Sequence, residues 1–94
     1  MNNQKIIRKE TIENGEHVYS YELIERRGKG LADFGMRLYS ISVSMQDTDG
    51  NVRRGEAKDI FSSKRKATLF FDKIVRNLAT PIDLRYVVED EITV

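Results

Sequence analysis

Hydrophobic and polar residues alternate most regularly between residues 37 and 46. From residue 39 onward the odd positions are apolar, and the even positions carry serine or glutamine. An alternation with a period of two is typical of a β-strand that buries one face and exposes the other. We therefore predict a half-buried strand over 37–46. Its core row is Tyr39, Ile41, Val43 and Met45, and its outer row is Ser40, Ser42, Ser44 and Gln46.

Two further strands are predicted upstream, at about residues 4–13 and 16–26, on either side of Asn14-Gly15. This dipeptide is a strong hairpin signal, because both residues accept the positive φ of a two-residue turn. If Asn14 and Gly15 form the loop, four cross-strand pairs follow: Ile6 with Leu23, Arg8 with Tyr21, Glu10 with Tyr19 and Ile12 with His17. This register predicts one face made of Ile6, Ile12, Tyr19, Tyr21 and Leu23.

A fourth strand is predicted at residues 52–60, and the length of the preceding loop decides its register. A two-residue loop at Asp49-Gly50 would bury three charged side chains on the core face, namely Arg54, Glu56 and Lys58. A three-residue loop, 48–50, with Gly50 in the left-handed conformation avoids this cost. It pairs Ile41 with Ala57 and Val43 with Gly55. We predict the three-residue loop, whose small partners leave a shallow trough for the side chains of a covering helix.

The hydrophobic period changes after residue 62 and becomes helical. An apolar stripe made of Ala67, Phe70, Phe71, Ile74 and Leu78 predicts a helix that ends near Ala79, with Ser62 or Ser63 as its N-cap. Thr80-Pro81 and Asp83 then supply a capping residue, a proline in the first turn and an acid at the third position. These signals predict a second, shorter helix to about residue 89. Its inner stripe is Leu84, Val87 and Val88.

These elements predict an α+β fold, in which a four-stranded antiparallel meander is followed by two C-terminal helices on one face. The 94 residues fit one domain, 1–94. The one long connection, residues 27–35, is rich in glycine and basic residues. We expect Leu31 or Phe34 to anchor this connection.

The amino-acid composition limits which catalytic and metal-binding sites the chain can form. The chain has no cysteine and a single histidine, His17, which we predict to be exposed or to pack across the strands beside Ile12. Disulfides, thiolate nucleophiles and cysteine-ligated zinc are therefore excluded. We predict no catalytic residue, no metal site and no cofactor, and hence a protein that is not an enzyme. The remaining catalytic alternative is a hydrolase or isomerase that uses Asp59 or Asp83 with arginine partners.

The sequence also indicates the cellular compartment of the protein. The start of the chain lacks the apolar stretch of a signal peptide. No apolar run approaches the ~18 residues that span a bilayer. The absence of cysteine fits a reducing compartment. We therefore predict a soluble, cytoplasmic protein that does not bind membranes.

The net charge of +1 conceals a basic segment and an acidic end. Residues 26–66 carry ten Lys or Arg against five Asp or Glu, whereas residues 81–94 carry one Arg against four acids. Three cations sit in the first turn of the first predicted helix, where the helix dipole disfavours them unless an anion binds. The candidate anion site is Arg53, Arg54, Ser62, Ser63, Lys64, Arg65 and Lys66. The alternatives are a solvated helix start and a nucleic-acid site, although no aromatic residues interleave the basic ones.

Two helices can cover only one face of the predicted sheet. The opposite face would show Ile7, Val18, Ile24 and Leu38 together with Ser40, Ser42 and Ser44. A homodimer, or an unidentified protein partner, could bury Ile24 and Leu38. The alternative is a set of scattered exposed apolar residues, which is common on protein surfaces.

Three segments resemble a family of small, uncharacterised bacterial proteins that is known only as a domain of unknown function and is found mainly in Firmicutes. The segments are Tyr21–Glu25, Phe34–Arg37 and Thr80-Pro81 with Leu84–Asp90. The resemblance implies a bacterial cytoplasmic protein without an assigned activity, and it transfers no catalytic residue. The helix start in that family tends to be acidic or neutral, so Lys64-Arg65-Lys66 departs from its pattern.

From these observations we predict a non-catalytic interaction module that associates with itself or with a protein partner through the uncovered face of the sheet. The alternative is a regulator that binds an anion or a nucleic acid through the basic helix start.

Overall fold

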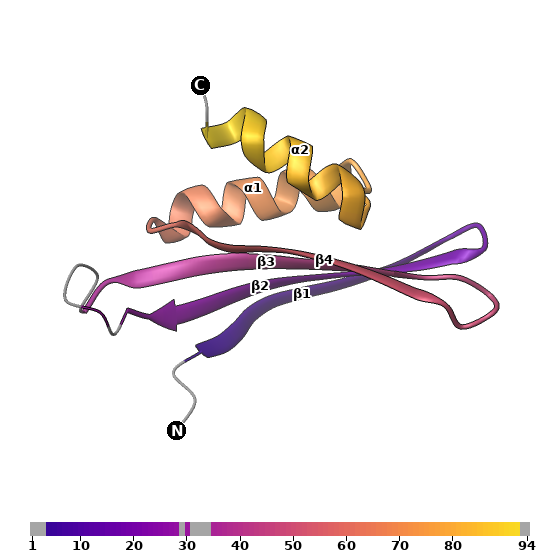
Figure 1. The fold of residues 1–94 in the computed structure, drawn as a ribbon, viewed down its shortest axis with the longest axis horizontal. Helices are drawn as coiled ribbons and strands as arrows, with labels where there is room; N and C mark the ends of the chain where they lie inside the picture. Colours follow the sequence, from indigo (N-terminus) through magenta and orange to yellow (C-terminus); the bar gives the residue numbers. More distant parts are fainter. Residues whose placement is uncertain (1–3, 29, 31–34, 93–94) are drawn as a thin grey trace.

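The computed structural model describes residues 4–28, 30 and 35–92, and it confirms the predicted α+β fold (Figure 1). Four strands form one antiparallel sheet in the order β1-β2-β3-β4, and two helices follow. The elements are β1 (Gln4–Asn14), β2 (His17–Arg27), β3 (Arg37–Gln46), β4 (Val52–Phe61), α1 (Lys64–Arg76) and α2 (Pro81–Ile92). Leu31 and Phe34, the predicted anchors of the β2–β3 connection, lie outside the described residues.

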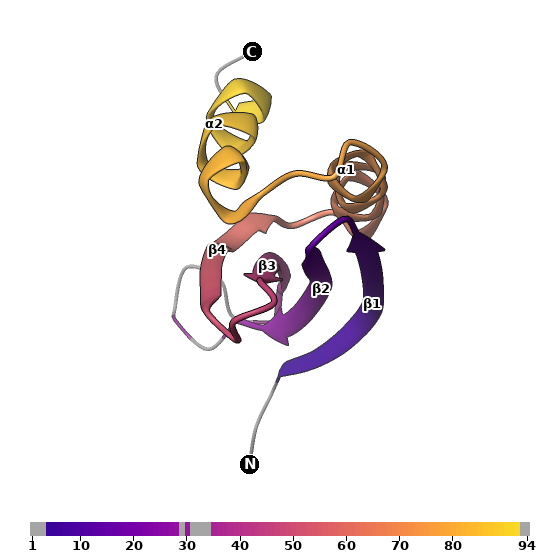
Figure 2. The same cartoon turned by 90° about the vertical axis from the view of Figure 1, so that its right-hand side faces the viewer.

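Both helices pack on the same face of the sheet (Figure 1). Helix α1 contacts β2, β3 and β4, whereas α2 contacts mainly β4 and also β3. Seen along the strands, α1 lies toward the β1 side of the sheet and α2 lies toward β4 (Figure 2). We call the face under the helices the inner face and the opposite one the outer face. No helix among the described residues is long and apolar enough to cross a membrane.

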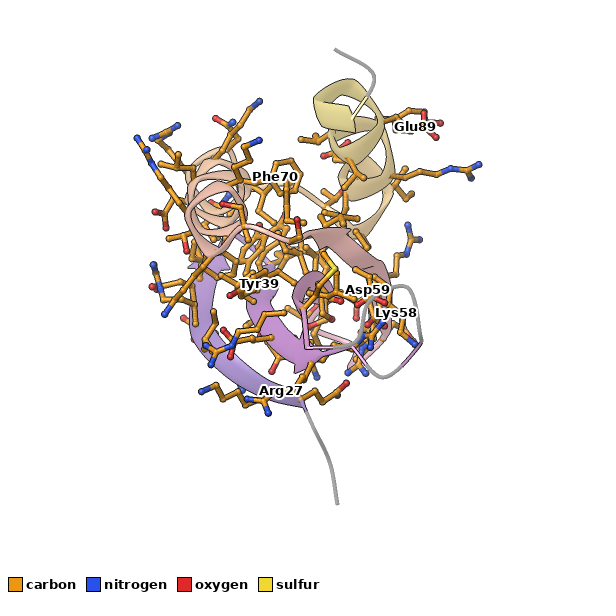
Figure 3. All side chains as sticks on the ribbon, turned by 90° about the vertical axis from the view of Figure 1, so that its left-hand side faces the viewer. Arg27, Tyr39, Lys58, Asp59, Phe70 and Glu89 are labelled. Atoms are coloured by element: carbon orange, nitrogen blue, oxygen red, sulfur yellow. The ribbon has the colours of Figure 1, made fainter. Side chains whose placement is uncertain are left out.

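The core lies between the inner face and the two helices. The predicted alternation of β3 is confirmed, because Tyr39, Ile41 and Val43 are buried there. The predicted stripe of α1 meets this row, and Figure 3 shows Phe70 extending between helix and sheet. The buried apolar residues are Tyr19, Tyr21, Leu23, Tyr39, Ile41, Val43, Ala67, Phe70, Phe71, Ile74, Ala79 and Leu84. The layered arrangement thus follows from two periodicities, two in the strands and 3.6 in the helix.

The predicted register of the β1–β2 hairpin is wrong by one residue on each strand. Asn14 pairs with His17, so the two-residue loop is Gly15-Glu16 and not Asn14-Gly15. Gly15 has φ 66, as the first loop position of a turn of the Gly-X type requires. Ile12 therefore pairs with Tyr19 instead of His17, and Arg8 pairs with Leu23. The pairing is thus displaced by two positions in total. An even displacement keeps each side chain on its face, so Ile12 still shares a face with Tyr19 and Tyr21.

A β-bulge in β1 reverses the predicted placement of two isoleucines. The register shifts between Ile6, which pairs with Ile24, and Arg8. Ile7 is the extra residue and packs against the core, whereas Ile6 is 54% exposed on the outer face. The predictions that Ile6 lies in the core and Ile7 outside are therefore wrong. A period-two pattern cannot locate a bulge, because the extra residue moves every later side chain to the other face.

The three-residue loop between β3 and β4 is confirmed. Ile41 pairs with Ala57 and Val43 with Gly55, and Gly50 has φ 87. The trough at Gly55 is filled by main chain, and not by the side chains that we expected. A Cβ atom on Gly55 would lie 2.7 Å from the carbonyl oxygen of Pro81, the first residue of α2. Glycine is required here because the start of α2 rests directly on β4.

Hydrogen bonds cap the start of α1 and fix both ends of the connection between the helices. The predicted N-cap Ser63 accepts a bond from the Lys66 N–H at 3.3 Å. Helix α1 ends earlier than Ala79, in a turn where Leu78 has φ 52 and the Ala79 N–H donates to Ile74. A capping box then starts α2, with reciprocal bonds between Thr80 and Asp83 at 3.2 and 3.1 Å.

The fully buried Tyr21 joins this connection to the sheet. Its hydroxyl donates to the carbonyl of Ala79 at 2.8 Å. Burial, with smaller contributions from Tyr19 and Asp83, raises the pKa of Tyr21 to about 12. The neutral donor is thereby preserved over the ordinary pH range, and it ties the helix connection to β2.

Substituting Gly55 by alanine should displace α2 from β4. The added methyl group would overlap the Pro81 carbonyl, so we expect a loss of about 1 to 3 kcal/mol in the free energy of unfolding, measured by chemical denaturation. Thr48→Ala, which changes an exposed side chain in the β3–β4 turn away from the outer face, is the control and should change stability by less than about 0.5 kcal/mol. Equal stability of Gly55→Ala and the wild type would contradict the close approach.

Candidate interaction surface

The outer face is formed by one row of side chains from each strand, and among the described residues no helix or strand covers it. Cross-strand pairing fixes which residues lie side by side, since paired residues of an antiparallel sheet point to the same face. The members are Gln4, Ile6, Lys9, Thr11 and Glu13 of β1; Val18, Ser20, Glu22, Ile24 and Arg26 of β2; Leu38, Ser40, Ser42, Ser44 and Gln46 of β3; and Val52, Arg54 and Glu56 of β4.

One end of the outer face is apolar. Ile6 pairs with Ile24, and Leu38 lies on the neighbouring strand beside the partner of Ile24, Ser40. Both predicted interface residues, Ile24 and Leu38, are half-buried on this face. Ile6 is the most exposed of the three and was missed, because the bulge that turns it outward leaves no signal in the hydrophobic pattern.

The centre of the outer face is polar. Ser20 pairs with Ser44, and Glu22 pairs with Ser42. Three serines in adjacent positions give short side chains that let another surface approach the sheet closely. Beyond them, Val18 and the 55% exposed Val52 lie in one cross-strand row at the hairpin end. The face therefore has apolar residues at both ends, and three serines together with the carboxylate of Glu22 between them.

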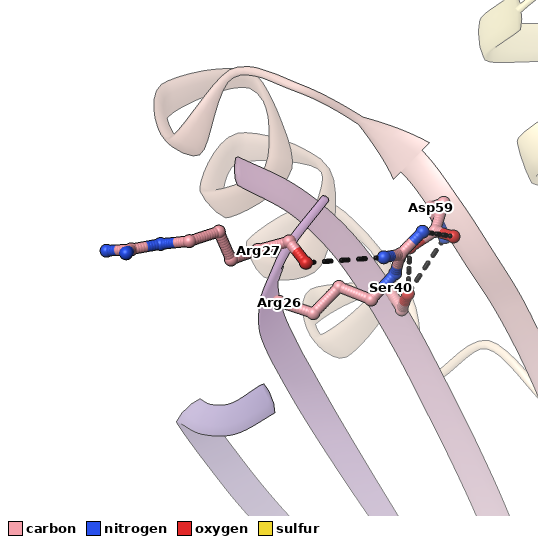
Figure 4. A network of polar contacts seen from close by, with 4 residues as sticks. All are labelled: Arg26, Arg27, Ser40 and Asp59. Carbon is pink, nitrogen blue, oxygen red and sulfur yellow. Dashed lines mark hydrogen bonds and ion pairs between the residues drawn. The ribbon is translucent and has the colours of Figure 1, made fainter. Parts of the chain in front are cut away.

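A network of polar contacts holds the edge of this face next to Leu38 (Figure 4). Ser40 lies opposite an irregular stretch of β4, because Tyr39 pairs with Phe61 but Ile41 with Ala57. Within that stretch Asp59 has φ 55, and its N–H donates to the Ser40 hydroxyl at 2.8 Å. Aspartate is among the few non-glycine residues that tolerate this conformation.

Arg26 closes the network with a two-pronged ion pair. Its Nε and Nη2 atoms donate to the two carboxylate oxygens of Asp59 at 2.7 and 2.5 Å. These bonds, with the charges of Arg26 and Lys58, lower the pKa of Asp59 against a partly opposing effect of burial. The carboxylate is therefore held ionised and bound, and its evident role is to fix the bulge of β4 against β2 and β3.

A buried carboxylate, that of Glu25, lies on the inner face. Glu25 accepts a bond from the Tyr39 hydroxyl at 3.0 Å, and Lys5 and Arg37 approach it at 3.7 and 3.8 Å. Burial, followed by the bond to Glu25, raises the pKa of Tyr39. The position of Tyr39 beneath the helices is visible in Figure 3. Lys5, Arg37 and the Tyr39 hydroxyl thus compensate the negative charge of Glu25 at one end of the core.

The structure separates the residues of the predicted anion site into two groups. Arg53 and Arg54 lie near the start of β4 and point to opposite faces, because Arg53 pairs with Met45 and Arg54 with Ser44. Ser62, Ser63, Lys64, Arg65 and Lys66 follow the other end of β4. At about 3.3 Å per residue, the strand sets the groups roughly 25 Å apart. Only the second group can act as one site.

His17 lies at the hairpin end of the sheet, far from the helices. It lines a shallow hollow with Met45, Asp47, Asn51 and Arg53. Asp47 accepts bonds from the backbone N–H groups of Asn51 and Asp49, both at 3.0 Å, and the bonds from Asn51 in particular lower its pKa. Its carboxylate thus stabilises the β3–β4 turn. Within the described residues, no group of three or more His, Asp or Glu side chains could hold a metal ion.

A family model described as a family of unknown function (DUF6514) matches residues 1–94. No curated protein matches the chain, and no solved structure does.

Replacing Asp59 by asparagine should lower stability in a pH-dependent way. Asparagine tolerates the positive φ but loses the ion pair, so we expect a loss of about 1 to 2 kcal/mol in unfolding free energy at pH 7. Unfolded aspartate titrates near pH 3.8 and the folded pKa is lower. The advantage of the wild type is therefore full well above pH 3.8, where the aspartate is ionised in both states, and it is lost as the pH falls through the lower folded pKa.

Denaturant titrations at several pH values between 2.5 and 7 would measure this difference. Asp49→Asn, in the exposed β3–β4 turn, is the matched control and should change stability by less than about 0.5 kcal/mol at pH 7. A difference between wild type and Asp59→Asn that stays constant over the whole pH range would contradict the assigned ion pair.

Proposed function

We propose that this chain, which belongs to the family of unknown function (DUF6514), is a non-catalytic interaction module that associates with a second copy through its outer face. The observation that supports this most is the distribution of the helices, which both lie on the inner face (Figure 1). The outer face is left with Ile6, Ile24 and Leu38 at one end. An apolar group on an otherwise bare sheet is typical of a protein–protein contact.

The size of the outer face suits a dimer. Its four strands have 10 or 11 residues each. With strands about 4.8 Å apart and about 3.3 Å per residue, the face covers roughly 600 Å². Two copies packed face to face would bury roughly 1,200 Å² together, the lower end of the range for specific interfaces. A small sheet protein also gains stability by such burial.

The β1 edge of the sheet is less suited to association than its face. β1 carries Lys5, Arg8, Lys9, Glu10 and Glu13 along its length, and a bulge interrupts it at Ile7. Charged side chains and bulges are the common means by which edge strands avoid pairing with other chains. Pairing of β1 edges is thereby disfavoured, which supports packing of the faces.

The proposal includes a setting in the reducing bacterial cytoplasm, in keeping with the resemblance to small Firmicutes proteins. The absence of cysteine supports it, because no part of this fold depends on a disulfide.

The alternative function is binding of an anion or a nucleic acid at the start of α1. Lys64, Arg65 and Lys66 are exposed there, and the first turn contains no acidic residue. The separation of Arg53 and Arg54 reduces this site to one helix end. Salt-sensitive retention of DNA or RNA in a mobility-shift assay, lost in Lys64→Gln/Lys66→Gln, would support this alternative. No retention at ~50 mM salt, and no thermal shift with phosphate or sulfate, would exclude it.

Substituting Ile6 by glutamate should dissociate the proposed dimer. Ile6 is 54% exposed in the single chain, so the change is compatible with folding. An unpaired carboxylate buried between two faces should weaken dimerisation at least roughly tenfold. Sedimentation at micromolar concentration would show a dimer for the wild type and a monomer for Ile6→Glu. Leu38→Glu should have the same effect, with thermal unfolding as the check on folding.

Leu69→Glu is the matched control, because Leu69 is 60% exposed on α1 and faces away from the outer face. It should leave the dimer unchanged. A wild type that sediments as a monomer, or a loss of association in Leu69→Glu equal to that in Ile6→Glu, would refute the proposal.

A further inference from the structure

We infer that the charged rim of the outer face fixes how two copies pack, with β1 of each copy over β4 of its partner. In this arrangement Lys9 meets the partner's Glu56, and Glu13 meets the partner's Arg54. The inference rests on the proposed function, since it specifies the partner contacts of that same face.

The four charges lie on the two edge strands of the outer face. Lys9 and Glu56 belong to one cross-strand row, which runs from Lys9 through Glu22 and Ser42 to Glu56. Arg54 ends the adjacent row, and Glu13 begins the row after that. From the hairpin end of the face toward its centre, the charges along β1 are therefore negative at residue 13, absent at residue 11 and positive at residue 9. β4 reads neutral, positive, negative at residues 52, 54 and 56.

These charges are available for a partner. Lys9, Glu13, Arg54 and Glu56 are all exposed. No ion pair within the described part of the chain involves any of them. By contrast, the charged residues next to the apolar end are neutralised internally, since Arg26 pairs with Asp59. The charges of this rim thus lie where two faces would meet.

Symmetry leaves two simple ways to pack the faces, and the charges distinguish them. The first is a two-fold axis perpendicular to the strands, along the row from Lys9 to Glu56, which is the central row of the face. It would set this row against the same row of the partner, so that Lys9 meets the partner's Lys9 and Glu56 meets the partner's Glu56. Like charges at close range cost affinity. An axis parallel to the strands, between β2 and β3, exchanges the two edges. It brings Lys9 to the partner's Glu56 in the same row, and Glu13 within one row of the partner's Arg54.

The second arrangement is also favoured by the positions of the apolar ends. Sheets packed face to face keep their strands within about 30° of each other, and either axis allows this. Only the axis parallel to the strands sets Ile6, Ile24 and Leu38 at the same end of the dimer in both copies. Opposite charges at the rim then act mainly on orientation and association rate, as is usual for peripheral ion pairs.

A charge-exchange experiment tests the arrangement. Lys9→Glu and Glu56→Lys, each alone, place like charges in both symmetric rim contacts, so each should weaken the homodimer roughly tenfold in low salt. Mixing the two variants should restore association. One rim contact then joins the glutamate introduced in the first variant to the lysine introduced in the second, and the other rim contact is the original pair.

Sedimentation and native mass spectrometry of the mixture would measure the heterodimer. Lys66→Glu on α1 is the matched control, because it makes the same charge change away from the outer face. It should leave the affinity unchanged.

The outcomes separate this inference from the proposed function. A dimeric wild type whose affinity is unaffected by Lys9→Glu and Glu56→Lys, or variants that do not recover on mixing, would overturn the arrangement and leave self-association standing. A monomeric wild type would overturn both. Recovery in the mixture, with the effect of each single variant reduced in ~0.5 M salt, is the result that we expect.

Discussion

The structure depends on the burial of one row of side chains from β2 and β3 against the apolar stripe of α1. Tyr21, Leu23, Ile41 and Val43 are fully buried in this contact, as is Phe71. Because a strand exposes alternate residues to opposite sides, burying this row commits the other row to the outer face. With α1 and α2 both on one side, no helix or strand within the described part of the chain covers the outer face. The proposed interaction surface is thus a consequence of the core.

Two bulges modify this simple alternation, and both occur at the same end of the sheet. In β1 the extra residue Ile7 turns inward and leaves Ile6 outside, next to Ile24. In β4 the irregular stretch around Asp59 is held by Ser40 and Arg26. The ion pair neutralises a cation that would otherwise lie beside Leu38. The apolar end of the outer face therefore consists of Ile6, which the bulge turns outward, and of Ile24 and Leu38. The charge of their neighbour Arg26 is compensated by Asp59.

The attachment of α2 differs from that of α1. α1 inserts aromatic side chains into the core, whereas α2 begins with its main chain against Gly55 and is fastened by the Tyr21 hydroxyl and the Thr80–Asp83 capping box. Ile82 and Tyr86 on its other side remain exposed, at 61% and 62%. Helix α2 thus completes the cover of the inner face beside β4, and it leaves the outer face and the rim charges accessible.

The sequence by itself determined the element order, the buried row of β3, the stripe of α1, and the β3–β4 register. Each of these follows from a local period or from the cost of burying Arg54, Glu56 and Lys58. The sequence also indicated Ile24 and Leu38 as apolar residues of the uncovered sheet face. The tertiary structure alone decided the β1–β2 turn, the outward position of Ile6 and the pairing of Arg26 with Asp59. It also separated Arg53 and Arg54 from the start of α1. These features depend on where a strand gains a residue and on distances between segments far apart in the chain, neither of which leaves a periodic trace in the sequence.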